Sequence, residues 1–122
     1  MKYTFFGDII ISPKNKEDYA MNLKFKNEIL DTVKFADTHT RKKLDEYVEA
    51  LDFDVIKEMQ VVMYVGRDWD KEDSLSPEEY YQSVREDFDR RWNTKEVETY
   101  QMLQKIQFVD YLKAGIKYLN LN

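Results

Sequence analysis

The chain opens with a β-like pattern of apolar residues and continues with a helical one. From residue 19 to residue 25 every second side chain is large and apolar, which predicts one buried face of a strand. Residues 3–11 are rich in aromatic and β-branched side chains, and a polar stretch with a proline separates the two segments over residues 12–18. We therefore predict an N-terminal β-hairpin within residues 1–26.

From Asn27 to the end of the chain the apolar residues are spaced by three and four, which predicts helices. Asn27 is the expected N-cap, and the residues that follow, up to residue 51, fit either one helix or two. The next helix is expected to begin at Asp52 or Asp54 and to end at Gly66, because glycine suits a left-handed C-terminal cap. Apolar residues lie on most of its sides, so we expect it to be the central helix.

Two further helix starts are marked by capping residues. Ser76 is followed by Pro77 and Glu79, a capping serine with a proline at the first helical position and a glutamate at the third. Residues 93–96 form a second start signal. Beyond it we expect one long helix, or two with a bend near Gln107, and the first apolar stripe consists of Val97, Tyr100, Leu103 and Ile106.

These elements predict one mainly α domain over residues 1–122. Residues 27–122 are expected to form a bundle of four or five helices. The β-hairpin is expected to pack on this bundle, so the fold is α+β only at its margin.

The composition argues against most catalytic and membrane functions. The 122 residues include no cysteine, one histidine and three glycines, so a thiol nucleophile, a zinc finger and a glycine-rich phosphate loop are excluded. His39 lies in a polar stretch, and no serine has the local context of a nucleophile elbow. The longest apolar run covers residues 61–65, far below the ~20 residues that span a bilayer. We predict a cytoplasmic protein that is not an enzyme, needs no cofactor and binds no membrane.

The net charge of −5 is unevenly distributed along the chain. Residues 1–44 carry +3, residues 45–89 carry −11 and residues 90–122 carry +3. Direct binding of nucleic acid through the acidic middle is disfavoured, because phosphates repel it. One hypothesis is an acidic inhibitor that imitates nucleic acid and blocks a nucleic-acid-binding protein, like phage-encoded inhibitors of the anti-CRISPR type. The expected carriers of that surface are Glu72, Asp73, Glu78, Glu79, Glu86, Asp87 and Asp89.

Residues 68–79 also resemble a degenerate EF-hand loop. Asp68, Asp70 and Glu72 occupy positions one, three and five of the loop pattern. Glu79 stands at position twelve, where a bidentate carboxylate closes a calcium site. Position six requires glycine for a sharp turn, but Asp73 stands there. A divalent-ion-responsive module is therefore a second alternative function, and a solvated acidic loop is the simpler interpretation.

Trp69 is the side chain that we expect to anchor a partner. It lies in the acidic segment beside Arg67 and Asp68, and Trp and Arg are enriched at interface hot spots. Basic clusters at residues 41–43 and 90–91 suit pairing with the acidic middle, within one chain or between two copies, so self-association is a further hypothesis. The function predicted first is a non-enzymatic protein-binding or regulatory module of unknown target.

Three motifs resemble those of an uncharacterised bacterial family. They are Leu51-Asp52, the sequence Val-Met-Tyr-Val-Gly-Arg at residues 62–67, and Asp-Tyr-Leu-Lys-Ala-Gly-Ile at residues 110–116. Through them, residues 51–119 resemble the domain of unknown function three-seven-seven-five. A proline that this family carries near residues 106 and 107 is absent here. The resemblance implies a compact helical domain and brings neither catalytic residues nor an activity with it.

Overall fold

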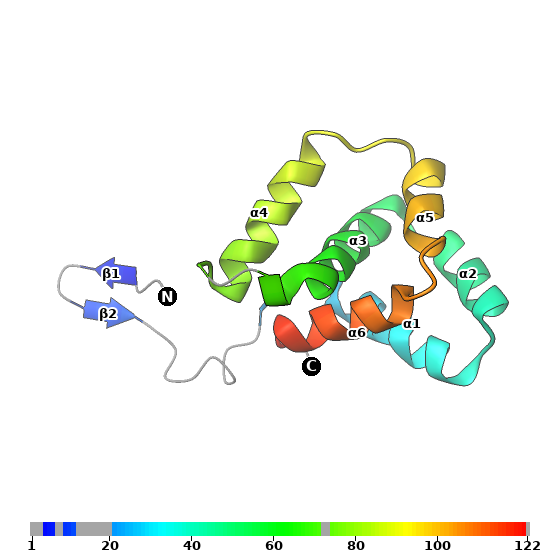
Figure 1. Ribbon diagram of the computed structural model, residues 1–122, viewed down its shortest axis with the longest axis horizontal. Helices are drawn as coiled ribbons and strands as arrows, with labels where there is room; N and C mark the ends of the chain where they lie inside the picture. Colours follow the sequence, from blue (N-terminus) through cyan, green and yellow to red (C-terminus); the bar gives the residue numbers. More distant parts are fainter. Residues whose placement is uncertain (1–3, 7–8, 12–20, 72–73, 122) are drawn as a thin grey trace.

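A computed structural model describes the backbone of residues 4–6, 9–11, 21–71 and 74–121, and the side chains of residues 21–71 and 74–121. Within these ranges the fold is built from six α-helices (Figure 1). They are α1 (Lys26–Thr38), α2 (Arg41–Glu49), α3 (Phe53–Asp68), α4 (Pro77–Asp89), α5 (Lys95–Leu103) and α6 (Phe108–Tyr118). A 3₁₀ turn, η2 (Trp69–Lys71), directly follows α3. The mainly α prediction is confirmed.

The number of helices exceeds the four or five expected. The sequence allowed either one helix or two in each of two stretches, and each stretch forms two. α1 ends at Thr38, and the extended backbone of His39 separates it from α2. Thr40 begins α2 as a cap, since its hydroxyl accepts the backbone N–H of Lys43 at 3.3 Å. A turn over residues 104–107 separates α5 from α6.

The N-terminal strands differ from the predicted hairpin. β1 (Thr4–Phe6) pairs antiparallel with β2 (Ile9–Ile11), so the segment expected to be one strand contains both. Residues 21–25 form no strand, and the prediction of a second strand is wrong there. Met21 and Leu23 are buried in the helical core, and the period of two reflects this non-helical segment packing one face on the helices. Residues 12–20 lie outside the described part, and packing of the hairpin on the bundle stays a prediction.

The starts of α4 and α5 follow local capping chemistry, whereas the N-cap residues of α1, α3 and α6 make no capping hydrogen bond with their side chains. Ser76 and Glu79 form a reciprocal capping box at the start of α4, and Thr94 caps α5, both as predicted. Asp52 is the N-cap of α3, as expected. The expected cap at Asn27 is wrong, because α1 already begins at Lys26.

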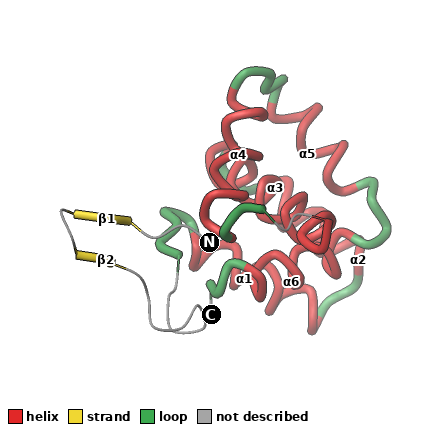
Figure 2. The backbone as a smooth tube through the Cα atoms, turned by 60° about the vertical axis from the view of Figure 1, so that its left-hand side comes forward, coloured by secondary structure: helices red, strands yellow, loops and turns green. Residues whose placement is uncertain are grey.

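α3 is the central helix, as expected, and is buried along most of its length. It contacts α1, α4, α5 and α6. Figures 1 and 2 show it between α4 on one side and α1 and α6 on the other. Among the described residues, no helix has the length and apolar character that a membrane span needs.

Two glycines let α3 and α6 cross in direct backbone contact. A Cβ at Gly66 would overlap the carbonyl oxygen of Tyr111 and lie 3.0 Å from the Cα of Gly115. A Cβ at Gly115 would overlap the carbonyl oxygen of Val62. The predicted left-handed cap at Gly66 is wrong, because the glycine lies inside α3, which continues to Asp68. This crossing joins the two longer motifs that carry the family resemblance, so those motifs encode helix packing.

Candidate functional site

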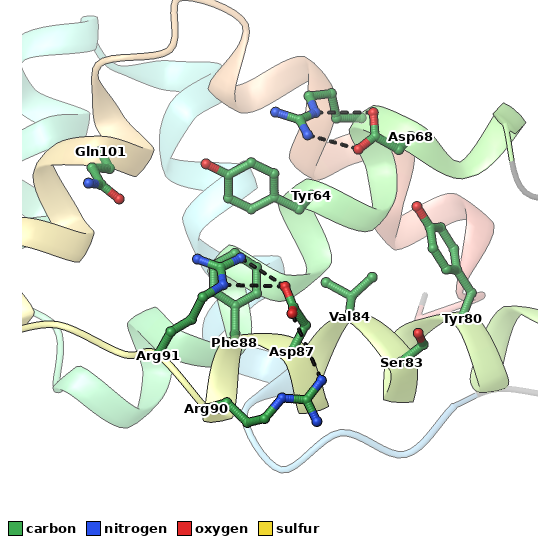
Figure 3. A pocket seen from close by; sticks show the side chains of 11 residues that line it. Tyr64, Asp68, Tyr80, Ser83, Val84, Asp87, Phe88, Arg90, Arg91 and Gln101 are labelled. Atoms are coloured by element: carbon green, nitrogen blue, oxygen red, sulfur yellow. Dashed lines mark hydrogen bonds and ion pairs between the residues drawn. The ribbon is translucent and has the colours of Figure 1, made fainter.

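The segment singled out from the sequence, residues 67–91, borders a groove between the end of α3 and α4. The groove has a volume of about 500 Å³ and is also lined by Gln101 of α5 (Figure 3). Its lining is rich in arginine and tyrosine: Arg67, Arg90, Arg91, Tyr64 and Tyr80. We call this the α3–α4 groove.

At one end of the α3–α4 groove, Arg67 and Asp68 form a two-point ion pair. The Nη2 and Nε atoms of Arg67 donate to the Asp68 carboxylate at 2.8 and 3.1 Å. The guanidinium also lies 4.6 Å from the ring centroid of Tyr64. The hydrogen bond from Arg67 holds the pKa of Asp68 below its ordinary value. Both charges are therefore compensated within the chain.

Asp87 is the second carboxylate of this groove, and two arginines approach it. Figure 3 shows Arg90 and Arg91 turned toward it. The Nη2 atoms of Arg90 and Arg91 lie 3.9 and 3.0 Å from the nearest carboxylate oxygen of Asp87. Arg91 also lies 4.4 Å from the ring centroid of Phe88. Outside the groove, Asp89 accepts hydrogen bonds from Arg85 at 3.0 Å and from the indole of Trp92 at 2.7 Å. Two of the seven predicted carriers of the acidic surface, Asp87 and Asp89, are thus paired with neighbouring arginines.

The remaining predicted site residues do not gather at one place. Glu78 and Glu86 are exposed on α4, whereas Glu79 accepts the backbone N–H of Ser76 at 2.9 Å in the capping box. Trp69 is 43 % exposed, and its ring lies 5.5 Å from that of Tyr118, so one face of the predicted anchor is covered.

Two of the predicted metal ligands, Asp68 and Glu79, form other bonds within the chain. Asp68 belongs to the last turn of α3, and Lys71 lies 3.5 Å from its carboxylate, in addition to Arg67. Asp70 lies in η2 and Glu79 in α4. Glu72 and Asp73 lie outside the described residues. Within the described part of the chain, no three acidic or histidine side chains are grouped as a metal site.

A buried carboxylate ties the segment before α1 to the centre of the fold. Glu58 of α3 is only 6 % exposed, and its Oε1 accepts the backbone N–H of Phe25 at 2.6 Å. Burial raises the pKa of Glu58, although the bond from Phe25 and the nearby Arg85 oppose this. Burial, with the charge of Glu58, also raises the pKa of Tyr81 to about 12. Glu58 thus holds the segment before α1 against α3.

Most of the exposed large apolar side chains in the described part of the chain lie on α5 or the turn after it, within the first apolar stripe that the sequence showed. Four large apolar side chains of the described residues are exposed, and three of them are on α5 or the turn after it. Val97 is 37 %, Tyr100 68 % and Ile106 92 % exposed. We call these three side chains the α5 face. The predicted stripe contained all three, but only its fourth member, Leu103, is buried, because α5 turns Glu98, Thr99 and Met102 inward.

Arg41 of α2 fixes the turn that carries Ile106. Its guanidinium donates to the backbone carbonyls of Leu103, of Lys105 at 3.2 Å and of Ile106 at 3.3 Å. It also donates to Asp45 at 2.8 Å. A cation is favoured here, because the last carbonyls of α5 have no partner within the helix and carry its negative dipole end. Arg41, predicted only as part of a basic cluster, is thus the clamp between α2 and the α5–α6 turn.

A second groove lies between α2 and α5, beside the α5 face. It has a volume of about 410 Å³ and is lined by Asp45, Glu49, Lys95, Glu96, Thr99, Tyr100, Leu103 and Gln104. Among the described residues, Glu49 and Glu96 form no ion pair, whereas Asp45 is bonded to Arg41. Thr99 is 5 % exposed, and its hydroxyl has no hydrogen-bond partner in the described structure. We call this the α2–α5 groove.

Comparisons with known proteins found no match: no protein-family model, no curated protein and no solved structure matches the chain. The family resemblance therefore stays a prediction that depends on its three motifs.

Proposed function

We propose that the chain is a non-enzymatic protein-binding module and that the α5 face is its docking surface. The observation that carries this proposal is that Val97, Tyr100 and Ile106, three of the four exposed large apolar side chains of the described part, fall on α5 or on the turn directly after it. Exposed apolar groups that cluster on one surface mark sites of association, whereas scattered ones need no explanation. Tyrosine is moreover among the residues that contribute most to interface energy.

The clamp formed by Arg41 supports the same proposal. Ile106 is 92 % exposed, so its own side chain does little to fix the turn. The backbone carbonyls of that turn are nevertheless fixed by hydrogen bonds from Arg41 of α2. A partner that binds a turn already fixed in shape does not have to order it, which removes part of the entropic cost of association. The α5 face therefore combines exposure with a rigid backbone.

The α3–α4 groove supports the proposal less well. Two of its arginines, Arg67 and Arg91, are already hydrogen-bonded to Asp68 and Asp87 and lie over aromatic rings. A partner that used these guanidinium groups would have to replace the internal bonds. The α5 face offers apolar area without that competition.

Affinity capture from the source cells, with matched variants, tests the proposal. Tagged wild-type protein is compared with the double variant Tyr100→Ser, Ile106→Ser. The control is Trp69→Ser, which removes the fourth exposed large apolar side chain, one that does not lie on α5. We expect the double variant to capture at least about tenfold less partner than the wild type, because two side chains that the partner would bury are lost. Trp69→Ser should capture as much partner as the wild type. Circular dichroism and urea unfolding verify that both variants are folded. Equal capture by wild type and double variant would refute the α5 face as the docking surface.

A further inference from the structure

We propose that the α2–α5 groove binds a basic amphipathic helix of a partner protein. The inference rests on the proposed function, since it names what docks beside the α5 face. The apolar side of such a helix would lie on Tyr100 and Leu103, and its lysine or arginine side chains would reach the carboxylates of Glu49 and Glu96.

The charge of the α2–α5 groove selects the sign of the occupant. Its lining has three carboxylates, from Asp45, Glu49 and Glu96, and one cationic side chain, Lys95. Arg41 compensates Asp45 at 2.8 Å, but no described residue forms an ion pair with Glu49 or Glu96. The groove therefore has an excess of negative charge, and a cationic occupant is favoured by complementarity.

Thr99 gives an independent indication that something polar enters this groove. Its side chain lines the groove and is 5 % exposed, while its hydroxyl oxygen has no hydrogen-bond partner among the described residues. A buried hydroxyl without a partner costs about 1–3 kcal/mol. The oxygen itself is covered, so the Thr99 side chain would turn about χ1 toward the groove to accept an N–H from a lysine or arginine of the occupant.

The shape of the surface favours a helix over an extended strand. The occupant would lie against helices α2 and α5, which offer no unpaired strand edge for β-augmentation. An amphipathic helix presents its own apolar residues at i, i+3, i+4 spacing, and these would contact Tyr100 and Leu103 of the groove. Because α5 spans nine residues, or about 13 Å, two to three turns of a partner helix are enough to cover it.

Fluorescence anisotropy with designed peptides tests the inference directly. The probe is a labelled amphipathic helix of about 16 residues with a leucine face and lysines elsewhere, and its control has glutamates in place of the lysines. The intact protein is expected to bind the lysine probe, less tightly at higher salt, and to ignore the glutamate peptide. Binding of both peptides, or of neither, would overturn the inference.

Matched charge variants locate the binding. The double variant Glu49→Gln, Glu96→Gln should weaken binding of the lysine probe at least about tenfold. The control, Glu78→Gln with Glu86→Gln, removes the same charge from α4 and should change it less than about twofold. An equal effect of the two double variants would show attraction by net charge alone and overturn the inference. Light scattering adds a further outcome. If the wild type is a dimer and only the Glu49→Gln, Glu96→Gln variant is a monomer, a second copy of the chain occupies the groove and the inference is overturned.

The inference and the proposed function can fail separately. If Tyr100→Ser, Ile106→Ser abolishes partner capture while Glu49→Gln, Glu96→Gln leaves it intact, the α5 face is confirmed and the basic helix is refuted. If neither pair of substitutions changes capture, both proposals fail.

Discussion

Replacement of Arg41 by alanine tests how the turn that carries Ile106 is held. The substitution removes every donor that α2 contributes to the carbonyls of Leu103, Lys105 and Ile106. It also removes the pair with Asp45. We expect the α5–α6 turn to lose its clamp while the helices themselves remain folded.

The size of the effect follows from the exposure of these groups. A hydrogen bond from a charged donor contributes about 1.5–3 kcal/mol when both groups are buried. Here the side chain of Arg41 is 35 % exposed, so water replaces part of each bond after the substitution. The exposed pair with Asp45 adds only about 0.3–0.5 kcal/mol. We therefore expect the free energy of unfolding to fall by about 2–3 kcal/mol, which lowers the melting temperature by roughly 8–12 °C.

Urea unfolding measures the stability, and hydrogen exchange measures the turn itself. In Arg41→Ala, the backbone amides of Gln104, Lys105 and Phe108, which bond to carbonyls within this region, should exchange faster than in wild type. Arg41→Lys keeps the charge but lacks the planar fork, so it should recover less than half of the loss. Arg90→Ala, at an exposed arginine, is the matched control and should change stability by less than about 0.5 kcal/mol. An Arg41→Ala protein as stable as this control, with unchanged exchange in the turn, would refute the clamp.

Three further substitutions test the interior and the helix caps. Gly115→Ala should lower the free energy of unfolding by at least about 2 kcal/mol in urea denaturation, because its Cβ would overlap the carbonyl oxygen of Val62; a gain in stability, as at an uncrowded helical glycine, would contradict the backbone crossing. Glu58→Gln should stabilise the protein at neutral pH, since burial raises the pKa of the Glu58 carboxyl and the folded state therefore holds its proton more tightly than the unfolded state. The wild type then loses stability as the pH rises from the ordinary pKa of 4.5 through the raised pKa. Urea unfolding at a series of pH values should therefore show that the variant is no more stable than the wild type below that range. A variant that becomes less stable than the wild type as the pH rises would contradict the raised pKa of Glu58. Ser76→Ala should cost about 1 kcal/mol in thermal unfolding, because it removes the acceptor at 3.2 Å from the Glu79 amide, and an unchanged melting temperature would show that the capping box does not stabilise α4.

The elements that sequence reasoning placed correctly depend on neighbouring residues. The start of α4 follows from Ser76 and Glu79, three positions apart, and the start of α5 follows from Thr94 in the same way. The apolar character of α3 on most of its sides likewise predicted its central position. These signals are local, because each depends only on residues that are close together in the sequence.

The features that were missed depend on residues far apart in the chain. Gly66 looked like a helix end, but its role comes from α6, which no local pattern links to it. Arg41 looked like part of a basic surface, but the backbone carbonyls to which it donates lie more than sixty residues away. The stripe on α5 was visible in the sequence, but periodicity identifies an apolar face without telling whether another helix covers it. The candidate docking surface is therefore a property of the tertiary structure.

Site-specific photo-cross-linking in the source cells tests the docking surface most directly. A photoreactive phenylalanine analogue replaces Tyr100, Ile106 or Trp69, one at a time, in the otherwise intact protein. We predict that a partner protein cross-links to positions 100 and 106 but not to position 69. Cross-links confined to position 69, or their absence at both positions of the α5 face, would contradict the account.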